Sequence, residues 1–241
     1  MKQIDVGMME YRHLNEQIRE SKAKQFTLSS VTGQRYIGCA QKDKIITING
    51  TAGNGLGSYL DGATLIVNGN AQDATGDTMN EGAIIIHGSS GDGTGYAMRG
   101  GKLYIRDSAG YRCGIHMKAF EEKQPLLIIG ERAGSFLGEY QAGGTIIVLG
   151  RNQEGKAPVG YFCGTGMHGG AIYLRCDTLP QGLPPQVAVR DADEEDKALL
   201  SNLLDEYCTL FEFDKEQLLA SHFFVLSANS TTPYRMMYTH V

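Results

Sequence analysis

Short apolar runs return along the middle of the chain at a nearly fixed interval. The first four end at positions 50, 69, 88 and 107, so each is 19 residues from the next. A constant period of this length indicates one structural unit per copy, packed on its neighbours. The later intervals lengthen to 23, 20 and 26 where extra residues intrude. The seven runs are Ile45–Gly50, Leu65–Gly69, Ile84–Gly88, Leu103–Asp107, Leu126–Gly130, Thr145–Gly150 and Ala171–Cys176.

The repeat length limits what each copy can form. A unit of 19 residues is too short for a strand and a helix with their connections, but it suffices for three short strands and three bends. Stacked copies would pair in parallel about 4.8 Å apart. The pattern therefore predicts an all-β fold, a parallel β-helix of about seven turns, with apolar or small residues in the inward columns.

Glycine and methionine recur in fixed columns of this repeat. Of the 32 glycines, 28 lie between Gly50 and Gly170, where they would serve repeated tight bends. A six-residue bend ends in glycine in every copy, and in four copies a methionine follows three residues later. We interpret the methionines as a core column. The six bend glycines are interpreted as structural: Gly57, Gly76, Gly95, Gly114, Gly138 and Gly164.

The two ends of the chain depart from the repeat. We predict a lead-in over 1–44, the repeat domain over 45–176 and a C-terminal cap over 177–241. Helical spacing of apolar residues predicts a short amphipathic helix near 8–21, and acidic residues mark the start of another helix near 193. Further segments are expected to be extended at 26–28, 35–37 and 223–226 and helical at 215–220. We expect these short terminal helices to cap the open ends of the stack.

Composition excludes several classes of partner. The net charge of −5 argues against nucleic acid and anionic membranes, and no apolar run is long enough to span a membrane. The N-terminus carries no apolar signal region, so the expected location is the cytoplasm. The five cysteines are widely spaced and include no C-x-x-C, which favours free thiols over disulfides or a metal site.

The motifs that could indicate a ligand or metal site are explained better as parts of the structural repeat. Gly164–Gly169 reads G-x-G-x-x-G, but a strand follows it where a dinucleotide site needs a helix. His87, His116 and His168 occupy three different phases of the repeat, so stacking would not gather them around a metal. We therefore predict no catalytic, cofactor-binding or metal-binding residue in this chain.

Six glycine-containing segments are distinctive, and a helix is expected after them over 193–211. They are Gly33–Gly38, Gly69–Asp73, Gly76–Asn80, Gly95–Gly101, Gly110–Met117 and Gly134–Gly144. Through these segments nearly the whole chain resembles the C-terminal GXGXG domain of the glutamate synthase large subunit. One of the subunits of formylmethanofuran dehydrogenase is similar to the same repeat. The resemblance implies a right-handed β-helix without catalytic residues, which holds the catalytic domains together.

The main hypothesis from this resemblance is a non-catalytic assembly subunit of a glutamate synthase-type complex. Partner subunits would supply the glutaminase and the FMN and iron–sulfur synthase that form glutamate from glutamine and 2-oxoglutarate. The chain starts Met1-Lys2 and has no clustered cysteines, so neither centre is expected within it. The insertions at 118–125 and 151–158 are candidate interaction loops.

Two alternatives stay open. The chain could be a scaffold subunit of another complex, such as formylmethanofuran dehydrogenase. A β-helix acyltransferase with a histidine between trimer subunits fits less well, because that fold has three aliphatic positions per coil and this chain has one main aliphatic run per repeat. The oligomeric state is not determined by the sequence, and a homo-oligomer is possible.

Overall fold

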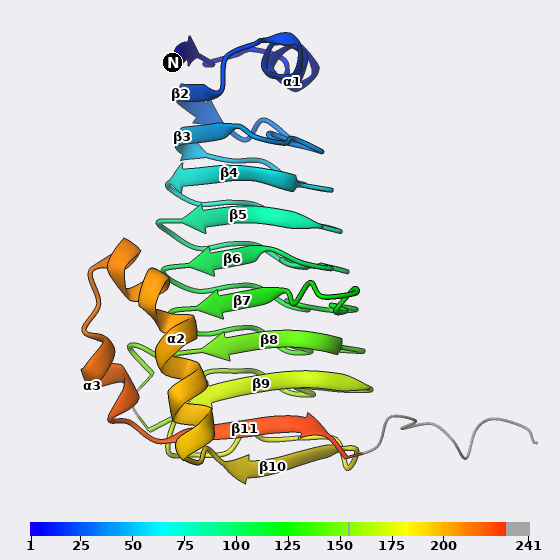
Figure 1. Cartoon of the computed structure of the whole chain (residues 1–241), viewed down its shortest axis with the longest axis vertical. Helices are drawn as coiled ribbons and strands as arrows, with labels where there is room; N and C mark the ends of the chain where they lie inside the picture. Colours follow the sequence, from blue (N-terminus) through cyan, green and yellow to red (C-terminus); the bar gives the residue numbers. More distant parts are fainter. Residues whose placement is uncertain (154, 230–241) are drawn as a thin grey trace, which may run out of the picture.

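The strands of the computed structural model, which describes residues 1–153 and 155–229, form one tall sheet (Figure 1). Neighbours from β1 to β9 pair in parallel in chain order, and β11 and β10 then close the sheet edge in antiparallel orientation. The strands are β1 Lys2–Asp5, β2 Gln25–Thr32, β3 Ile45–Thr51, β4 Asp61–Asn68, β5 Glu81–Ile86, β6 Lys102–Ile105, β7 Leu126–Ile129, β8 Ala142–Val148, β9 Gly169–Arg175, β10 Val187–Asp191 and β11 Phe223–Ala228.

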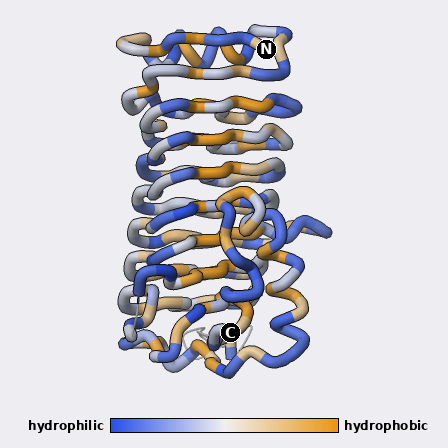
Figure 2. Tube along the Cα trace, turned by 90° about the vertical axis from the view of Figure 1, so that its left-hand side faces the viewer, coloured by the Kyte–Doolittle hydropathy of each residue, from blue (hydrophilic) through white to orange (hydrophobic). Residues whose placement is uncertain are grey.

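The seven apolar runs all form strands, β3 to β9, and successive strands pair at the repeat period. Ile46, for example, lies beside Leu65, and Leu65 lies beside Ile84. Inward side chains of these strands stack into a continuous core, visible in Figure 2 as apolar segments lying one above another. Each fully buried aliphatic side chain contributes about 1.5–3 kcal/mol through burial.

The predicted all-β, right-handed parallel β-helix with short capping helices is wrong. The strands form a single open sheet of 11 strands, and it is mixed, because β10 and β11 run antiparallel to their neighbours. Each repeat contributes one strand instead of three. The glycine-rich remainder of each repeat forms turns with positive φ, joined to the neighbouring repeats by several backbone hydrogen bonds, such as Gly76 N to Leu56 O at 2.8 Å.

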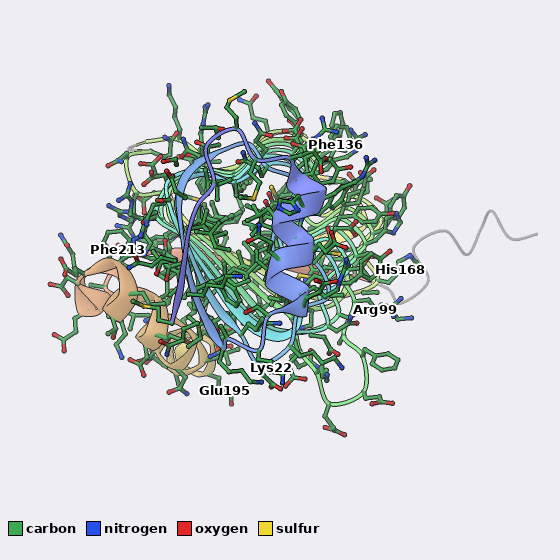
Figure 3. The ribbon with its side chains drawn as sticks, turned by 90° about the horizontal axis from the view of Figure 1, so that it is seen from above. Lys22, Arg99, Phe136, His168, Glu195 and Phe213 are labelled. Atoms are coloured by element: carbon green, nitrogen blue, oxygen red, sulfur yellow. The ribbon has the colours of Figure 1, made fainter. Side chains whose placement is uncertain are left out.

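Three helices accompany the sheet in the described residues: α1 Tyr11–Glu20, α2 Glu194–Phe211 and α3 Lys215–Leu219. Helix α1 lies across the N-terminal end of the stack (Figure 3). Helix α2 is 18 residues long and does not cap the other end. It packs Leu200, Leu204 and Tyr207 onto the outer side chains of the later strands, as a second core layer.

Two further local expectations differ from the structure. Arg35–Ile37 is a turn rather than a strand, since Tyr36 has φ of 58° and joins the column of turns. Strands β1 and β10 had no predicted counterpart. Residues 230–241 of the predicted C-terminal segment lie outside the described residues. Within the described residues, no helix has the length and apolarity needed to cross a membrane.

Candidate interaction surface

The turns that follow each strand carry a surface that changes along the stack. The fourth position of the six-residue bend is Gly55, Ala74 and Gly93 in the first three copies. In the next three copies it is Arg112, Phe136 and Phe162. Backbone bonds between neighbouring copies, such as Phe136 N to Tyr161 O at 2.9 Å, hold this column in line.

The bulky residues in this column occupy backbone geometry that favours glycine. Arg112, Phe136 and Phe162 have φ of 55°, 63° and 62°. A second column places His116 and Tyr140 at 56° and 55°. A left-handed conformation costs an ordinary residue about 1–2 kcal/mol. Both columns have positive φ in the early copies too, for example 55° at Ala74 and 51° at Thr78, so the turn geometry belongs to the repeat and the late copies differ in the size of the side chain.

The side chains of these columns pack on one another at the surface. Phe136 and Phe162 stack with ring centroids 5.0 Å apart, and the Arg112 guanidinium lies 4.7 Å from the Phe136 centroid. His116 stacks on Tyr140 at 5.1 Å. The rings are thereby held rigid before any partner arrives.

Much of this aromatic area faces solvent. Tyr111 and Tyr161 are 54% and 55% exposed, and Phe162 is 47% exposed. Exposed aromatic side chains beside arginine are typical of the central part of protein interfaces. We call this set the aromatic face: Tyr96, Tyr111, Arg112, His116, Phe136, Tyr140, Tyr161 and Phe162.

Basic residues accompany the aromatic face. Arg112 Nε lies 3.3 Å from Glu139 Oε2, and this carboxylate is itself nearly buried. Seen along the stack, Arg99, His168 and Phe136 all lie on the side of the molecule away from Phe213, which follows α2 (Figure 3). The aromatic face and the helical cover therefore occupy different sides.

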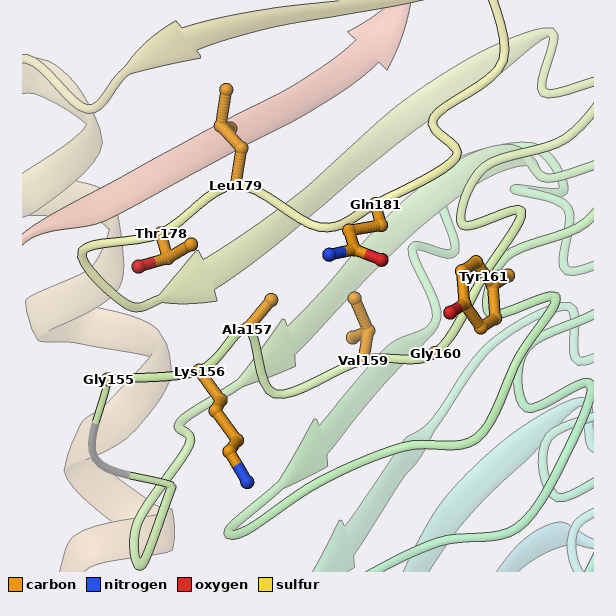
Figure 4. Close-up of a pocket in the computed structure, with 9 residues that line it drawn as sticks. All are labelled: Gly155, Lys156, Ala157, Val159, Gly160, Tyr161, Thr178, Leu179 and Gln181. Carbon is orange, nitrogen blue, oxygen red and sulfur yellow. The ribbon is translucent and has the colours of Figure 1, made fainter.

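A small pocket adjoins the aromatic face at Tyr161. It has a volume of about 310 Å³ and lies between the turn around Val159 and the exit segment around Leu179. Figure 4 shows the Ala157 and Val159 side chains pointing toward the exit segment, from which the Gln181 side chain points back toward Val159. Its partly apolar lining could accept one side chain of a docked protein.

The six glycines singled out from the sequence all lie at one corner of the stack, with φ between 64° and 73°. At Gly76 a Cβ would lie 2.6 Å from the Leu103 side chain, and at Gly114 it would lie 2.5 Å from Ile146. They touch the core rather than the surface. We retain their structural role as a proposal for these positions: Gly57, Gly76, Gly95, Gly114, Gly138 and Gly164.

The other sequence candidates are dispersed. Gly164–Gly169 forms the turn before β9. His87 packs edge-on against Phe211, whereas His116 belongs to the aromatic face. Cys113 and Cys163 are free and fully buried, and burial raises the pKa of both thiols to about 12. Among the described residues, no cluster of three or more histidine, cysteine or carboxylate side chains could hold a metal ion.

The aromatic face was not singled out from the sequence, although the signal was present. The aligned copies show bulky residues replacing glycine or alanine in a column where the bend favours small ones. Bulky residues in three consecutive copies, at a turn position that favours small residues, indicate a surface with a role beyond stacking.

Comparison with known proteins agrees with this repeat organisation. The model of the GXGXG motif family matches residues 9–230. A protein of Methanocaldococcus jannaschii named "Uncharacterized protein MJ1350" is 44% identical over 249 residues, which cover 98% of this chain and 95% of the relative.

A solved structure also shares the fold. One chain of the formyltransferase/hydrolase complex (FhcABCD) of Methylorubrum extorquens, solved with methylofuran, superposes with a TM-score of 0.63 at 22% identity. The match covers 84% of this chain and 72% of that one. Since the family model spans most of the sequence, this chain is a member of the GXGXG motif family.

Proposed function

We propose that this chain is a non-catalytic scaffold subunit of a cytoplasmic multi-subunit enzyme complex, and that the aromatic face holds a catalytic partner. One observation carries the proposal. Three consecutive copies place arginine or phenylalanine at the turn position where the three copies before them have glycine or alanine, and the late turns carry the exposed rings of Tyr111, Tyr161 and Phe162. Burying these exposed rings under a partner would contribute favourable free energy to binding, which the isolated chain lacks.

The first candidate is a complex that transfers or forms formyl groups, of the formylmethanofuran dehydrogenase or formyltransferase/hydrolase kind. It is supported by the shared fold with a chain of the Methylorubrum extorquens complex. In this candidate the partners supply the catalytic centres and the present chain supplies the surface that positions them.

The second candidate is a glutamate synthase-type complex. It is supported by the segments Gly95–Gly101 and Gly110–Met117, through which the sequence resembles the GXGXG domain of glutamate synthase. Here the partners would be a glutaminase and a synthase carrying FMN and iron–sulfur clusters, with neither cofactor bound by the present chain.

Site-specific photo-crosslinking in the source cell tests the proposal and separates the candidates. A photoreactive residue at position 161 should capture one defined partner. The matched control is position 59, where Tyr59 is 53% exposed against 55% for Tyr161 but lies in an early copy. Capture of formyltransferase, hydrolase or molybdenum or tungsten enzyme subunits supports the first candidate, and capture of a glutaminase or flavin synthase supports the second. Equal crosslinking from both positions contradicts the aromatic face as the interface.

The affinity for the captured partner, measured with purified proteins, completes the test. Tyr161→Ala should weaken binding by about 2 kcal/mol, the size typical of an interface hot spot, and Tyr59→Ala should leave it unchanged. Unfolding midpoints of both variants should stay close to that of the parent chain, because both side chains are half exposed.

A further inference from the structure

A polar cleft lies beneath α3, next to the pocket at Tyr161, with which it shares Gly155 and Lys156. A cleft of about 390 Å³ opens between the segment after β8, the end of β9 and the junction of α3 with β11. Arg151 and Lys156 line it from the first of these segments, and Arg175 from the second. Gln217, Ser221 and His222 line it from the third.

The cations in this cleft are not held in close ion pairs, although the Asp177 carboxylate acts electrostatically on Arg175. Within the described residues, no ion pair involves Arg151, Lys156 or Arg175. Arg175 donates from Nη1 to Leu149 O at 2.8 Å, while its Nε is buried and has no hydrogen-bond partner among those residues. A buried donor on a cation is costly when it is left unpaired.

The surroundings hold the guanidiniums in place without neutralising them. Arg151 lies over the Phe213 ring, 3.5 Å from its centroid, and donates from Nη1 to Arg106 O at 3.3 Å. Burial lowers the pKa of Arg175, the Asp177 carboxylate opposes this shift, and the nearby positive charge of Arg151 adds to it. Both side chains are thus fixed by neutral groups, and their charges face the same cleft.

One lining carboxylate and one histidine complete the charge balance. Asp177 lines the cleft but is exposed to solvent. His222 has Nδ1 at 2.9 Å from Cys176 O and Nε2 at 3.0 Å from Asp191 Oδ1, an arrangement that suits a protonated ring donating from both nitrogens. Among the described lining residues, three permanent cations therefore accompany one exposed carboxylate, with a paired histidine at the rim.

We propose that this cleft binds a phosphate group of a small molecule, with Arg151, Lys156 and Arg175 as its ligands. A guanidinium fork matches two phosphate oxygens, and Gln217 and Ser221 add neutral donors. A dianion balances this surplus of positive charge better than a single carboxylate does. The cleft is larger than inorganic phosphate, which leaves room for the remainder of a phosphate ester.

Isothermal titration of the full chain with inorganic phosphate at low ionic strength tests the site. We expect saturable binding that raises the unfolding midpoint and weakens with added chloride. Acetate, which carries one charge, should bind at least about tenfold more weakly. Phosphate that fails to bind saturably, or acetate that binds as well as phosphate, overturns the proposal.

Variants locate the binding. Arg175→Gln removes the buried donor and should weaken phosphate binding at least about tenfold. Lys156→Gln changes an exposed side chain, so it tests the same cleft if Arg175→Gln fails to fold. The matched control is Arg99→Gln on the opposite side of the stack (Figure 3). A control variant that loses as much affinity as Lys156→Gln shows diffuse attraction and overturns the assignment.

Discussion

The early and late halves of the stack share one backbone pattern and differ in what covers it. In the early half, β2 to β4, buried and exposed positions alternate, so one strand face is covered and the other meets solvent. In the late half, β6 to β9, all four residues of β7 are buried. The outer side chains there, such as Tyr104 and Ile128, pack under α2.

The turns show the same division on the other side of the molecule. Early copies have Gly55 and Ala74 where late copies have Phe136 and Phe162. In the late half the chain's own helix covers the strand face, whereas α2 does not reach the aromatic turn face. The repeat accounts for the stacking of copies in both halves. In the late half, the departures from the repeat lie where α2 packs on the strands and where we propose that a partner binds.

The largest loss of stability is expected at Gly130, where one repeat contacts both a neighbouring repeat and α2. A Cβ added at Gly130 would lie 2.0 Å from Arg106 O and 2.6 Å from Tyr207 Oη. Gly130→Ala must therefore push a neighbouring repeat and α2 apart, and we expect a loss of about 4 kcal/mol in the free energy of unfolding. Urea unfolding measures it.

The control is Gly93→Ala, at a turn where a Cβ would have no heavy atom within 4 Å. Its φ of 64° limits the expected cost to about 1–2 kcal/mol. Equal losses for the two variants would show that contact between repeats does not decide which glycines matter.

The second effect separates the two halves directly. Leu204 in α2 is fully buried against the sheet, and Leu204→Ala should cost about 3 kcal/mol through the cavity it leaves. Amide hydrogen exchange should accelerate in β6 to β9 more than in β2 to β4. Leu199→Ala, at a position that is 43% exposed on the same helix, should change stability by less than about 0.5 kcal/mol. Uniform acceleration across the whole sheet would mean that the halves unfold as one unit.

A smaller effect on stability, which depends on pH, concerns the contact that attaches α2 to β10. Asp196 at the start of α2 is nearly buried, pairs with Arg190 of β10 and accepts a hydrogen bond from Tyr173 Oη at 2.9 Å. The Arg190 guanidinium lowers the pKa of Asp196 to about 2. Because this pKa lies below the ordinary aspartate value of about 4, the pair stabilises the fold above that pH and is lost as pH falls toward 2.

Replacing the arginine tests this attachment. Arg190→Gln should lower the stability at neutral pH, where the charged Asp196 carboxylate loses its main partner. The difference from the parent chain should shrink to a small remainder near pH 2, where Asp196 is about half protonated in the parent chain. A difference that stays constant from pH 7 to pH 2 would assign the loss to packing of Arg190 instead.

Local patterns in the sequence identified much of the fold. The apolar runs became β3 to β9, and the acidic start near Asp193 is a capping box, in which Asp193 and Asp196 each accept from the other's backbone. The sheet topology was not predictable in the same way. The period allowed three strands per copy, but positive φ at residues such as Thr78 and Ala97 turns those segments into bends.

Features that depend on contacts between distant parts of the chain were not predicted from the sequence. Strand β10, Val187–Asp191, is mostly exposed and exists because it pairs with β11, which lies more than 30 residues further along the chain. The cover by α2 could have been inferred, since Leu126–Ile129 is apolar on both strand faces and needs a second layer. The proposed phosphate cleft could not have been inferred from the sequence, because Arg151, Arg175 and His222 come together only through the packing of α3.

The smallest effect on stability is expected at the aromatic face, and it gives the sharpest test of what that face is for. Phe136→Gly removes a side chain that stacks on Phe162 and supports Arg112, a loss of about 1–2 kcal/mol. It also relieves a left-handed phenylalanine, a gain of about 1–2 kcal/mol, so the unfolding midpoint should hardly move. If the face exists to hold a partner, the same variant should weaken that complex at least about tenfold. A large loss of stability with unchanged partner affinity would instead make the rings part of the fold, and the late half would then differ from the early half only in its helical cover.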